Sequence, residues 1–337
     1  MVKGRFKSKF FMFHKKIENK KKMKRNNNSL FLLIFVFFFQ IVSSQIEIRN
    51  CTALQEMMTG DSNVKYQLSE DIDCKGKNFI SIGNDTEKFY GTLEGNGFSI
   101  KNLFIDQSSS KNYSALFSYG SNCSVSNITL LNVSSNGVFY GAALFARCDY
   151  CSISNVNLSS SVIKNSSYSG GVVAYLYYGV LKKIVASKNI ISPYFSESDS
   201  IFGSAVCAYG SNSNMSEIHA DNNEISSDVG KFNAPICGYL FRGYLINATS
   251  INNTVSISGN GTVIYSSGVC GYLAAGNFLN ILSSGNKVFC NSSTTYCSGV
   301  VSYNTISCSM ENITSSRNTI SSITYGPNCY YSLTSLI

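Results

Sequence analysis

The sequence repeats with a period of about 30 residues, and this repeat constrains the fold more than any local propensity. Seven copies of one outline follow one another from Ser114 onward. The copy from Ser267 reads SGVCGYLAAGNFLNILSSGNKV, and it matches GGVVAYLYYGVLKKIVASKNII from Gly170 and APICGYLFRGYLINATSINNTV from Ala234. Spacing within a copy is nearly fixed, and the variable spacing falls between copies. A repeating cross-section with loops of different length at one corner is therefore predicted.

Three columns of residues hold across the copies. In the first, a short apolar pair is followed by a small residue and then by tyrosine, with Arg147 as the one break. The tyrosines are Tyr119, Tyr175, Tyr209, Tyr239, Tyr272 and Tyr303. The second column is an apolar residue after an asparagine slot, at Ile128, Val156, Ile184, Ile218, Ala248, Ile281 and Ile313. The third column is asparagine, at Asn189, Asn223, Asn253, Asn286 and Asn318.

Short apolar runs rich in Val, Ile and Tyr, broken by Gly, Ser and Asn, favour a coil of short strands over a helical repeat. One such coil cannot bury its inner face alone, but stacking it on the next coil buries continuous aliphatic columns. The predicted fold is therefore all-β, a single parallel β-helix with about 30 residues per coil. About eight coils at the inter-strand spacing would make a rod roughly 40 Å long.

Asparagine precedes the inward aliphatic residue at Asn102, Asn127, Asn155, Asn247, Asn280 and Asn312. Asparagine tolerates a positive φ better than other non-glycine residues, so a tight corner that recurs in every coil would select it. Stacked amides can also hydrogen-bond along the rod. Lys183 and Glu217 interrupt this column, which predicts a discontinuous corner ladder.

The GVCGY core from Gly268 and the GVVAY core from Gly171 resemble the glycine–aliphatic repeat, the GLUG motif, of bacterial and protist surface proteins. The stretch from Tyr66 to Leu103, YQLSEDIDCKGKNFISIG followed by FYGTLEGNGFSIKNL, is similar to the lead-in of the same proteins and is the more specific signal. The resemblance covers nearly all of 60–325. It implies a right-handed, pectin-lyase-like parallel β-helix, often found in adhesins, and it supplies no catalytic residues.

The first 44 residues are predicted to be a basic leader plus signal peptide. A basic stretch is followed by a hydrophobic run of about 13 residues from Leu30 to Val42, shorter than the roughly 20 that span a bilayer. We expect cleavage after Ser44, with translation starting at Met1 or at Met23. The alternative is an uncleaved anchor, the one route to a membrane that this sequence offers. Both alternatives place the rest of the chain in a secreted or cell-surface location.

The positive charge of the chain belongs to this leader. The whole chain has 27 Lys and Arg against 19 Asp and Glu, and residues 1–44 hold 11 of the basic and one of the acidic residues. The remainder carries 27 − 11 = 16 basic and 19 − 1 = 18 acidic residues, a net charge of about −2. A nucleic-acid partner is therefore not expected, because no basic face remains for phosphate contacts.

The remaining chain divides into three predicted regions. Residues 45–109 form an N-terminal cap and the first coils, 110–325 form the β-helix repeats, and 326–337 form a C-terminal tail. A short helix within 45–60 is the expected cap, with Thr52 at its N-terminus and Leu54, Met57 and Met58 on its apolar side. Such a cap would cover the first open coil.

Disulfides are expected for a secreted chain with 12 cysteines. Cys123 and Cys151 occupy one slot in adjacent copies, which brings their Cα atoms within bonding range. Cys290 and Cys297 could staple one loop, and Cys51 and Cys74 could tie down the cap. The trio Cys207, Cys237 and Cys270 shares another slot and is expected to pack as small buried hydrophobes. Metal binding is not expected, because the CxxC pair of Cys148 and Cys151 does not recur, as it would in a typical zinc site.

Glycosylation is expected on exposed N-x-S/T sequons, of which the chain after Gln45 has about 14. The candidates are Asn84, Asn112, Asn165, Asn214, Asn260 and Asn291. Asn127, Asn247 and Asn312 are also sequons, but they fall in the corner ladder. Since a buried ladder asparagine cannot carry a glycan, we expect these three to be modified less often.

An enzyme is not expected, and no cofactor is implied. Carboxylates gather in the lead-in, at Glu70, Asp71, Asp73, Asp85, Glu87 and Glu94. They suit turns and caps, and no paired acids with a basic partner are evident for acid–base work on a polysaccharide. The tyrosine column is the candidate binding surface, because alternation along a strand would place the rings outside if the small residues point inward. The alternative is that the rings only stack on one another for stability.

Three functions follow from these features. The first is a secreted or surface β-helix that binds carbohydrate or a surface protein in the manner of an adhesin. The second is a structural component of a cell wall or matrix without a discrete ligand. The third, well behind, is a polysaccharide-degrading enzyme.

Overall fold

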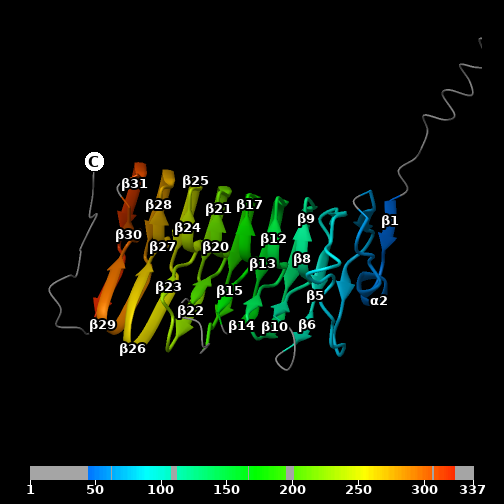
Figure 1. Ribbon diagram of the computed structural model, residues 1–337, viewed down its shortest axis with the longest axis horizontal. Coiled ribbons are helices and arrows are strands. Elements are labelled where there is room, and N and C mark those ends of the chain that lie inside the picture. Colours follow the sequence, from blue (N-terminus) through cyan, green and yellow to red (C-terminus); the bar gives the residue numbers. More distant parts are fainter. Residues whose placement is uncertain are drawn as a thin grey trace, which may run out of the picture. The chain divides into compact units, whose positions relative to one another are not determined.

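The chain winds into a parallel β-solenoid of right-handed type with about eight turns of about 30 residues (Figure 1). This computed structural model describes residues 45–61, 63–107, 112–165, 167–194, 201–305 and 307–322. The predicted fold class is confirmed over these residues. The leader, with its signal peptide, and the tail at 326–337 lie outside them and stay predictions.

Three parallel sheets run along the described part of the solenoid, with 12, 13 and 7 strands. The first sheet contains β1 (Gln45–Ile48), β2 (Lys65–Leu68), β3 (Ile72–Asp73), β4 (Thr92–Glu94), β5 (Ser99–Lys101), β9 (Ser124–Leu131), β13 (Ser152–Ser159), β17 (Val180–Ser187), β21 (Asn214–Asp221), β25 (Tyr244–Ile251), β28 (Asn277–Ser284) and β31 (Ser309–Ser316). The third sheet contains β8 (Phe117–Ser121), β12 (Phe145–Asp149), β16 (Val173–Tyr177), β20 (Cys207–Ser211), β24 (Cys237–Phe241), β27 (Cys270–Ala274) and β30 (Val301–Asn304).

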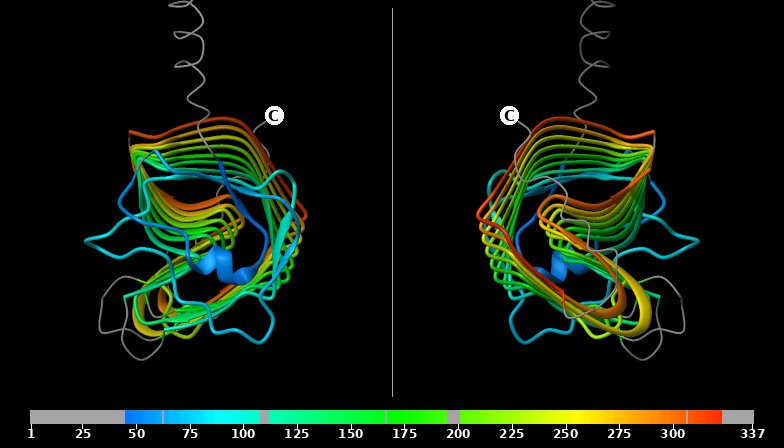
Figure 2. Two further views of the ribbon diagram at one scale, coloured as in Figure 1. Left: turned by 90° about the vertical axis from the view of Figure 1, so that its right-hand side faces the viewer. Right: turned by 90° about the vertical axis from the view of Figure 1, so that its left-hand side faces the viewer.

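The second sheet doubles back on itself and forms a narrow lobe of the cross-section (Figure 2). One row contains β6 (Phe104–Asp106), β10 (Ser134–Gly137), β14 (Val162–Asn165), β18 (Ile190–Ile191) and β22 (Glu224–Ser227). The other row contains β7 (Tyr113–Ser114), β11 (Tyr140–Gly141), β15 (Tyr168–Gly170), β19 (Phe202–Ser204) and β23 (Phe232–Asn233). Both rows merge in β26 (Thr254–Ser267), which pairs with β29 (Lys287–Ser298) and through it with β32 (Thr319–Ser322).

The aliphatic column predicted from sequence fills the interior under the first sheet. Ile128, Val156, Ile184 and Ile218 occupy paired register positions and are at most 1% exposed. Parallel pairing places equivalent residues of successive turns next to each other, so one aliphatic position per turn yields a continuous core. This is why a chain with such short apolar runs can bury a large hydrophobic cluster.

The predicted corner has a left-handed backbone in every turn of the repeat region. φ lies between 52° and 57° at Asn127, Asn155, Asn247, Asn280 and Asn312, and Lys183 and Glu217 keep the same conformation. The amide ladder is discontinuous, as predicted: Asn155 donates to Asn127 and Asn312 donates to Asn280, with a break at the two charged residues.

Two details of the corner prediction were wrong. The corner amides lie at the surface, exposed or partly exposed, so the expected conflict between the ladder and glycosylation at Asn127, Asn247 and Asn312 does not arise. Asn102 belongs to a second left-handed corner, where Asn132 donates to it at 2.6 Å. The two corners differ in position, because Asn127 lies within β9, whereas Asn102 and Asn132 come directly after the ends of β5 and β9.

The third asparagine column forms a buried ladder. Asn189, Asn223, Asn253 and Asn286 are at most 2% exposed. The amide oxygens of Asn223, Asn253 and Asn286 each accept two hydrogen bonds from the preceding asparagine: the backbone N–H and the Nδ2–H of Asn223 reach Asn253 Oδ1 at 2.9 Å each. Asn189 Oδ1 accepts the N–H of Ser161. These buried polar groups are therefore satisfied by stacking from turn to turn.

A short helix, α2 (Cys51–Gln55), lies at the N-terminal end of the solenoid (Figure 2). Its N-cap is Asn50 and not Thr52, because the Asn50 side chain accepts hydrogen bonds from the N–H groups of Thr52 and Ala53. Leu54 is fully buried, whereas Met58 is 56% exposed and does not belong to the apolar side. The expected Cys51–Cys74 disulfide joins the helix to the first turns.

Candidate functional site

The tyrosine column forms a continuous ladder along the third sheet. Tyr175, Tyr209, Tyr239 and Tyr272 stack face to face, with ring centroids 4.8 to 5.2 Å apart and planes within 10° of parallel. Tyr303 continues the stack at 4.9 Å. Because these tyrosines occupy paired register positions in successive parallel strands, the strand spacing itself brings the rings into contact.

Arg147 does not interrupt this ladder, although it breaks the sequence pattern. Its guanidinium carbon lies 4.6 Å from the ring centroid of Tyr119 and 5.3 Å from that of Tyr175. A guanidinium plane can replace an aromatic ring in a stack through cation–π contacts. The ladder therefore runs from Tyr119 to Tyr303.

A second aromatic ladder lies beside the first, on the second sheet, and was missed in the sequence. Its members are Tyr113, Tyr140, Tyr168, Phe202, Phe232, Tyr265 and Tyr296. Consecutive centroids are 4.6 to 5.4 Å apart. The sequence does carry a signal, since an aromatic residue stands seven positions before each column residue from Arg147 onward.

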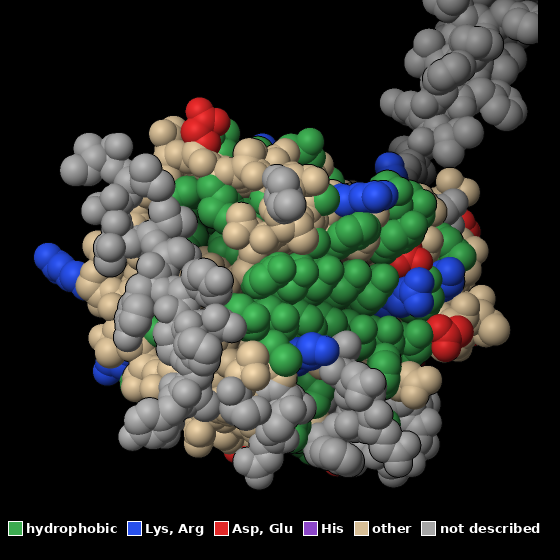
Figure 3. All heavy atoms as spheres, turned by 60° about the vertical axis from the view of Figure 1, so that its left-hand side comes forward, with side chains coloured by type: hydrophobic (Ala, Val, Ile, Leu, Met, Phe, Trp, Pro, Cys, Tyr) green, Lys and Arg blue, Asp and Glu red, His purple; other side chains and the backbone are tan. Residues whose placement is uncertain are grey.

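The two ladders meet edge to face. Phe202 lies 5.4 Å from Tyr209 at an interplanar angle of 86°, and Phe232 lies 5.3 Å from Tyr239 at 90°. We call this pair of ladders the aromatic strip. Hydrophobic side chains gather in rows that run along this face of the solenoid, with Lys and Arg side chains beside them (Figure 3).

The small residue before each tyrosine makes room for the strip. Ala146 and Ala174 cluster with Tyr140 and Tyr168, and Ala208 clusters with Phe202 and Phe232. The small residues therefore pack under the second ladder and not with the leading aliphatic residues in the main core, as the sequence prediction assumed. Gly238 has no space for a side chain, since a Cβ would lie 2.7 Å from the carbonyl oxygens of Ala208 and Phe232.

The strip is half-buried and not a fully exposed ladder. Tyr119 is 5% exposed and Tyr303 is 39% exposed. The exposed fraction lies between these values for the other four, Tyr175, Tyr209, Tyr239 and Tyr272. Within the described part of the chain, no group hydrogen-bonds to the hydroxyls of these last four tyrosines. The strip thus combines the stacking that one hypothesis expected with half-buried phenol groups to which no described residue hydrogen-bonds.

The N-terminal end of the strip is polar. Tyr119 donates a hydrogen bond to Asp149, which also pairs with Arg147 at 3.2 Å. Tyr113 donates to Asp85 at 2.7 Å. A pocket next to this end is lined by Asp85 and Tyr113, together with Thr59, Ile80, Ser81, Gly83, Asn84, Glu87, Asn112 and Ser118. The carboxylates of Asp149 and Asp85 therefore accept the phenol hydrogens of Tyr119 and Tyr113.

Burial keeps the ladder phenols protonated. It raises the pKa of Tyr209 to about 12 from the ordinary value of 10 and also raises that of Tyr175, Tyr239 and Tyr272. An uncharged phenol can donate one hydrogen bond and accept another. At neutral pH the middle of the strip is therefore a neutral surface.

We expect alkaline unfolding as these phenols ionise. A folded pKa above the unfolded value means that the stabilisation is fully present below pH 10 and is lost as the pH rises toward about 12. Phenolate absorbance should show a class of tyrosines that titrates only as the circular dichroism signal is lost. Titration of all tyrosines near pH 10 with unchanged circular dichroism would contradict the buried ladders.

The cysteines only partly follow the sequence prediction. Cys290–Cys297 is bonded as expected, although both residues lie in strand β29 and not in a loop. Cys151 pairs with Cys148 and not with Cys123, which remains a free thiol. The difference arises because Cys148 and Cys151 flank one tight corner, where a three-residue separation allows a Cα distance of 5.9 Å.

The other cysteine slot agrees with the packing hypothesis. Cys207, Cys237 and Cys270 are free and fully buried in the main core. Burial raises the pKa of Cys207 and Cys270, so these thiols stay neutral. They pack as small hydrophobic side chains.

One sequon prediction conflicts with the structure. Asn165 is 0% exposed and lies inside the second-sheet lobe, so a glycan cannot be accommodated on it in the folded chain. Asn84, Asn112, Asn214 and Asn291 are exposed and stay predicted glycan sites. Asn260 lies in β26, but the structure does not describe its side chain, so Asn260 stays a predicted glycan site.

The lead-in carboxylates have the turn and capping roles considered from sequence. Asp71 pairs with Lys101 at 2.6 Å and accepts the Ser99 N–H, and these bonds lower the pKa of Asp71 to about 2. Glu94 accepts hydrogen bonds from Ser126 and Asn127. These groups hold adjacent turns together.

No protein-family model matches the chain. A segment of 78 residues is 38% identical to halomucin from Haloquadratum walsbyi; it is 20% of this chain and spans about 1% of the length of halomucin. The resemblance to GLUG-repeat proteins therefore stays a prediction for the motif itself.

One solved structure shares the solenoid fold, and a second was matched at a lower score. A Bacteroides ovatus protein, provisionally described as an immunoglobulin A1 protease, is 15% identical, with a TM-score of 0.51 over 83% of this chain and 78% of that one. The SRRP of L. reuteri 53608 is 13% identical, with a TM-score of 0.30 over 82% of this chain and 99% of that one. The first similarity shows the common fold.

Among the described residues, no helix is long and hydrophobic enough to cross a bilayer.

Proposed function

We propose that this chain is a secreted or cell-surface β-solenoid that binds carbohydrate along the aromatic strip, as an adhesin-like module and not as an enzyme. The observation that carries the proposal is the row of half-buried tyrosines whose hydroxyls have no hydrogen-bond partner in the described chain. Aromatic rings pack against the apolar faces of sugars, and free phenols can donate to and accept from sugar hydroxyls. The neutral middle of the strip suits an uncharged, extended glycan.

Two further features support this proposal. The predicted signal peptide would place the solenoid outside the cytosol, where polysaccharides are found. The similarity to part of halomucin agrees with an extracellular location. Because the ladder repeats once per turn, a long glycan could contact several tyrosines at once, which raises avidity without any single deep pocket.

Electrophoresis through gels that contain a soluble neutral polysaccharide tests the proposal, with xylan, galactomannan and hydroxyethylcellulose as probes. We expect at least one gel to retard the secreted protein. The double variant Tyr209→Phe with Tyr239→Phe keeps both stacks and removes two free hydroxyls, so affinity should fall about tenfold, which corresponds to about 1.4 kcal/mol.

The control is Tyr178→Phe, because Tyr178 is 47% exposed but lies outside both ladders. Retardation should be unchanged in this variant. An equal loss of affinity in the Tyr178→Phe control would show that the binding site is not on the aromatic strip. No retardation of the folded protein by any probe would favour the structural role without a ligand, for which the continuous stacking of the rings is already sufficient.

A further inference from the structure

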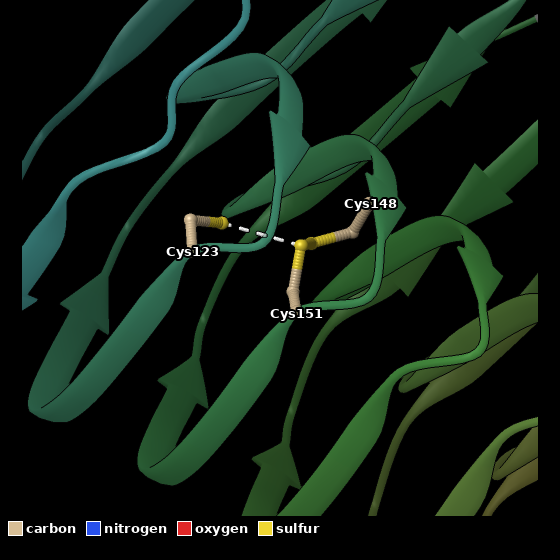
Figure 4. A group of neighbouring side chains, drawn as sticks. All are labelled: Cys123, Cys148 and Cys151. Atoms are coloured by element: carbon tan, nitrogen blue, oxygen red, sulfur yellow. Dashed lines mark hydrogen bonds between the residues drawn. A yellow bond between two sulfur atoms is a disulfide. The ribbon is translucent and has the colours of Figure 1, made fainter. Parts of the chain in front are cut away.

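Three cysteine sulfurs meet at the corner between the third and first sheets in two adjacent turns (Figure 4). Cys123 lies between β8 and β9, Cys148 lies in β12, and Cys151 lies between β12 and β13. Their Sγ atoms are all within 4.8 Å of one another, and the residues are 4%, 0% and 2% exposed. This cluster belongs to the main hydrophobic core and not to the aromatic strip, and it has no part in the proposed function.

The free thiol is directed at the disulfide. Cys123 Sγ lies 3.2 Å from Cys151 Sγ and donates its hydrogen to that sulfur. The next residues along the chain, Ser124 and Ser152, are register partners. Parallel pairing therefore sets the Cα atoms of Cys123 and Cys151 about 4.8 Å apart, within the range of a disulfide.

Two of the later turns fill the same corner without sulfur, although Cys308 returns to the Cys151 position in the last described turn. The positions equivalent to Cys148 and Cys151 hold Leu176 and Gly179, and further on Leu240 and Gly243. In each turn the leucine packs over the glycine. A Cβ added to Gly179 would lie 2.3 Å from Leu176 Cδ1, and one added to Gly243 would lie 2.6 Å from Leu240 Cδ1. In the first turn, Gly120 stands where Cys148 does, and a Cβ there would lie 2.8 Å from Cys123 Sγ. Packing alone thus has a sulfur-free solution in this fold.

We propose that Cys123, Cys148 and Cys151 form an internal thiol–disulfide exchange centre in which Cys151 alternates between two partners. The Cys123 thiolate attacks Cys151 Sγ, the Cys123–Cys151 bond forms, and the Cys148–Cys151 bond breaks. Cys148 leaves as a thiolate and takes up the proton that Cys123 released. One disulfide and one thiol are present before and after, so no oxidant or reductant is consumed.

The two states differ in what they hold together. Cys148–Cys151 closes three residues of one corner, whereas Cys123–Cys151 joins two turns and closes a loop of 28 residues. The longer loop restricts the unfolded chain more strongly. Burial raises the pKa of Cys123 to about 12, which keeps the resting thiol protonated and shields it from external reagents.

Disulfide mapping of the secreted full chain tests this proposal. Free thiols are alkylated in denaturant at low pH, and the bridged peptides are identified by mass spectrometry. In Cys148→Ala we expect Cys123–Cys151 in nearly all molecules. In the unmodified chain, incubation at mildly alkaline pH without added thiol, which increases the thiolate fraction, should yield both pairings in one sample.

Two variants serve as controls. Cys148→Leu with Cys151→Gly recreates the corner of later turns, so it should fold and leave Cys123 as a free thiol. Cys123→Ser should show Cys148–Cys151 alone. Free Cys123 and Cys151 in a folded Cys148→Ala variant would overturn the proposal. If Cys148→Ala does not fold, recovery of Cys148–Cys151 alone from the unmodified chain after the alkaline incubation would also overturn it.

Discussion

Asn253→Ala should lower the free energy of unfolding by about 3 to 5 kcal/mol, because it leaves several buried polar groups unsatisfied. Asn253 Oδ1 accepts two hydrogen bonds from Asn223, and Asn253 Nδ2 donates to Ala220, Ser250 and Asn286. Urea unfolding followed by circular dichroism and tyrosine fluorescence measures the loss, since the chain has no tryptophan.

The matched control for this variant is Asn247→Gly, in the exposed corner ladder. Asn247 has a φ of 54°, which glycine adopts freely, so the change should alter stability by no more than about 0.5 kcal/mol. Equal losses in the two variants would show that burial does not distinguish the ladders. In a solenoid the comparison should use the first unfolding transition, because turns can unfold in groups.

Phe117→Ala should cost about 3 to 5 kcal/mol of stability, the usual range for deleting a fully buried aromatic ring. Phe117 is 0% exposed and stacks on Phe89 at 4.3 Å and on Phe145 at 4.8 Å. This stack joins the lead-in turns to the first repeats. Phe289→Ala is the control, since Phe289 is 39% exposed and its removal should cost far less. A thermal unfolding midpoint that falls equally in both variants would contradict the assigned core.

The fold could be predicted from sequence because a repeat imposes its own geometry. Once each turn supplies an aliphatic residue at the same position, parallel stacking is the arrangement that buries all of them. The corner was predictable for a similar reason, since Asn127 and its equivalents tolerate the left-handed backbone that a tight bend requires. Lys183 and Glu217 adopt the same φ, which shows that the surrounding strands impose the bend.

The candidate site was predicted only in part. The tyrosine column was visible in the sequence, but its partner ladder was not recognised because it contains both tyrosine and phenylalanine. The role of Arg147 depends on the two rings beside it, Tyr119 and Tyr175, and sequence spacing gives no such contact. The depth of the strip was likewise undetermined, since it depends on how far the second sheet folds back.

The repeat, the parallel all-β fold and the positions of the columns follow from the sequence alone, because they depend on a period and on the preferences of residue types. The burial of one asparagine ladder, the enclosure of Asn165 and the pairing of Cys151 with Cys148 become evident only in the folded chain. These outcomes depend on bends of the cross-section and on which side chains share a corner. The bends set these distances in space, and the spacing along the chain does not give them by itself.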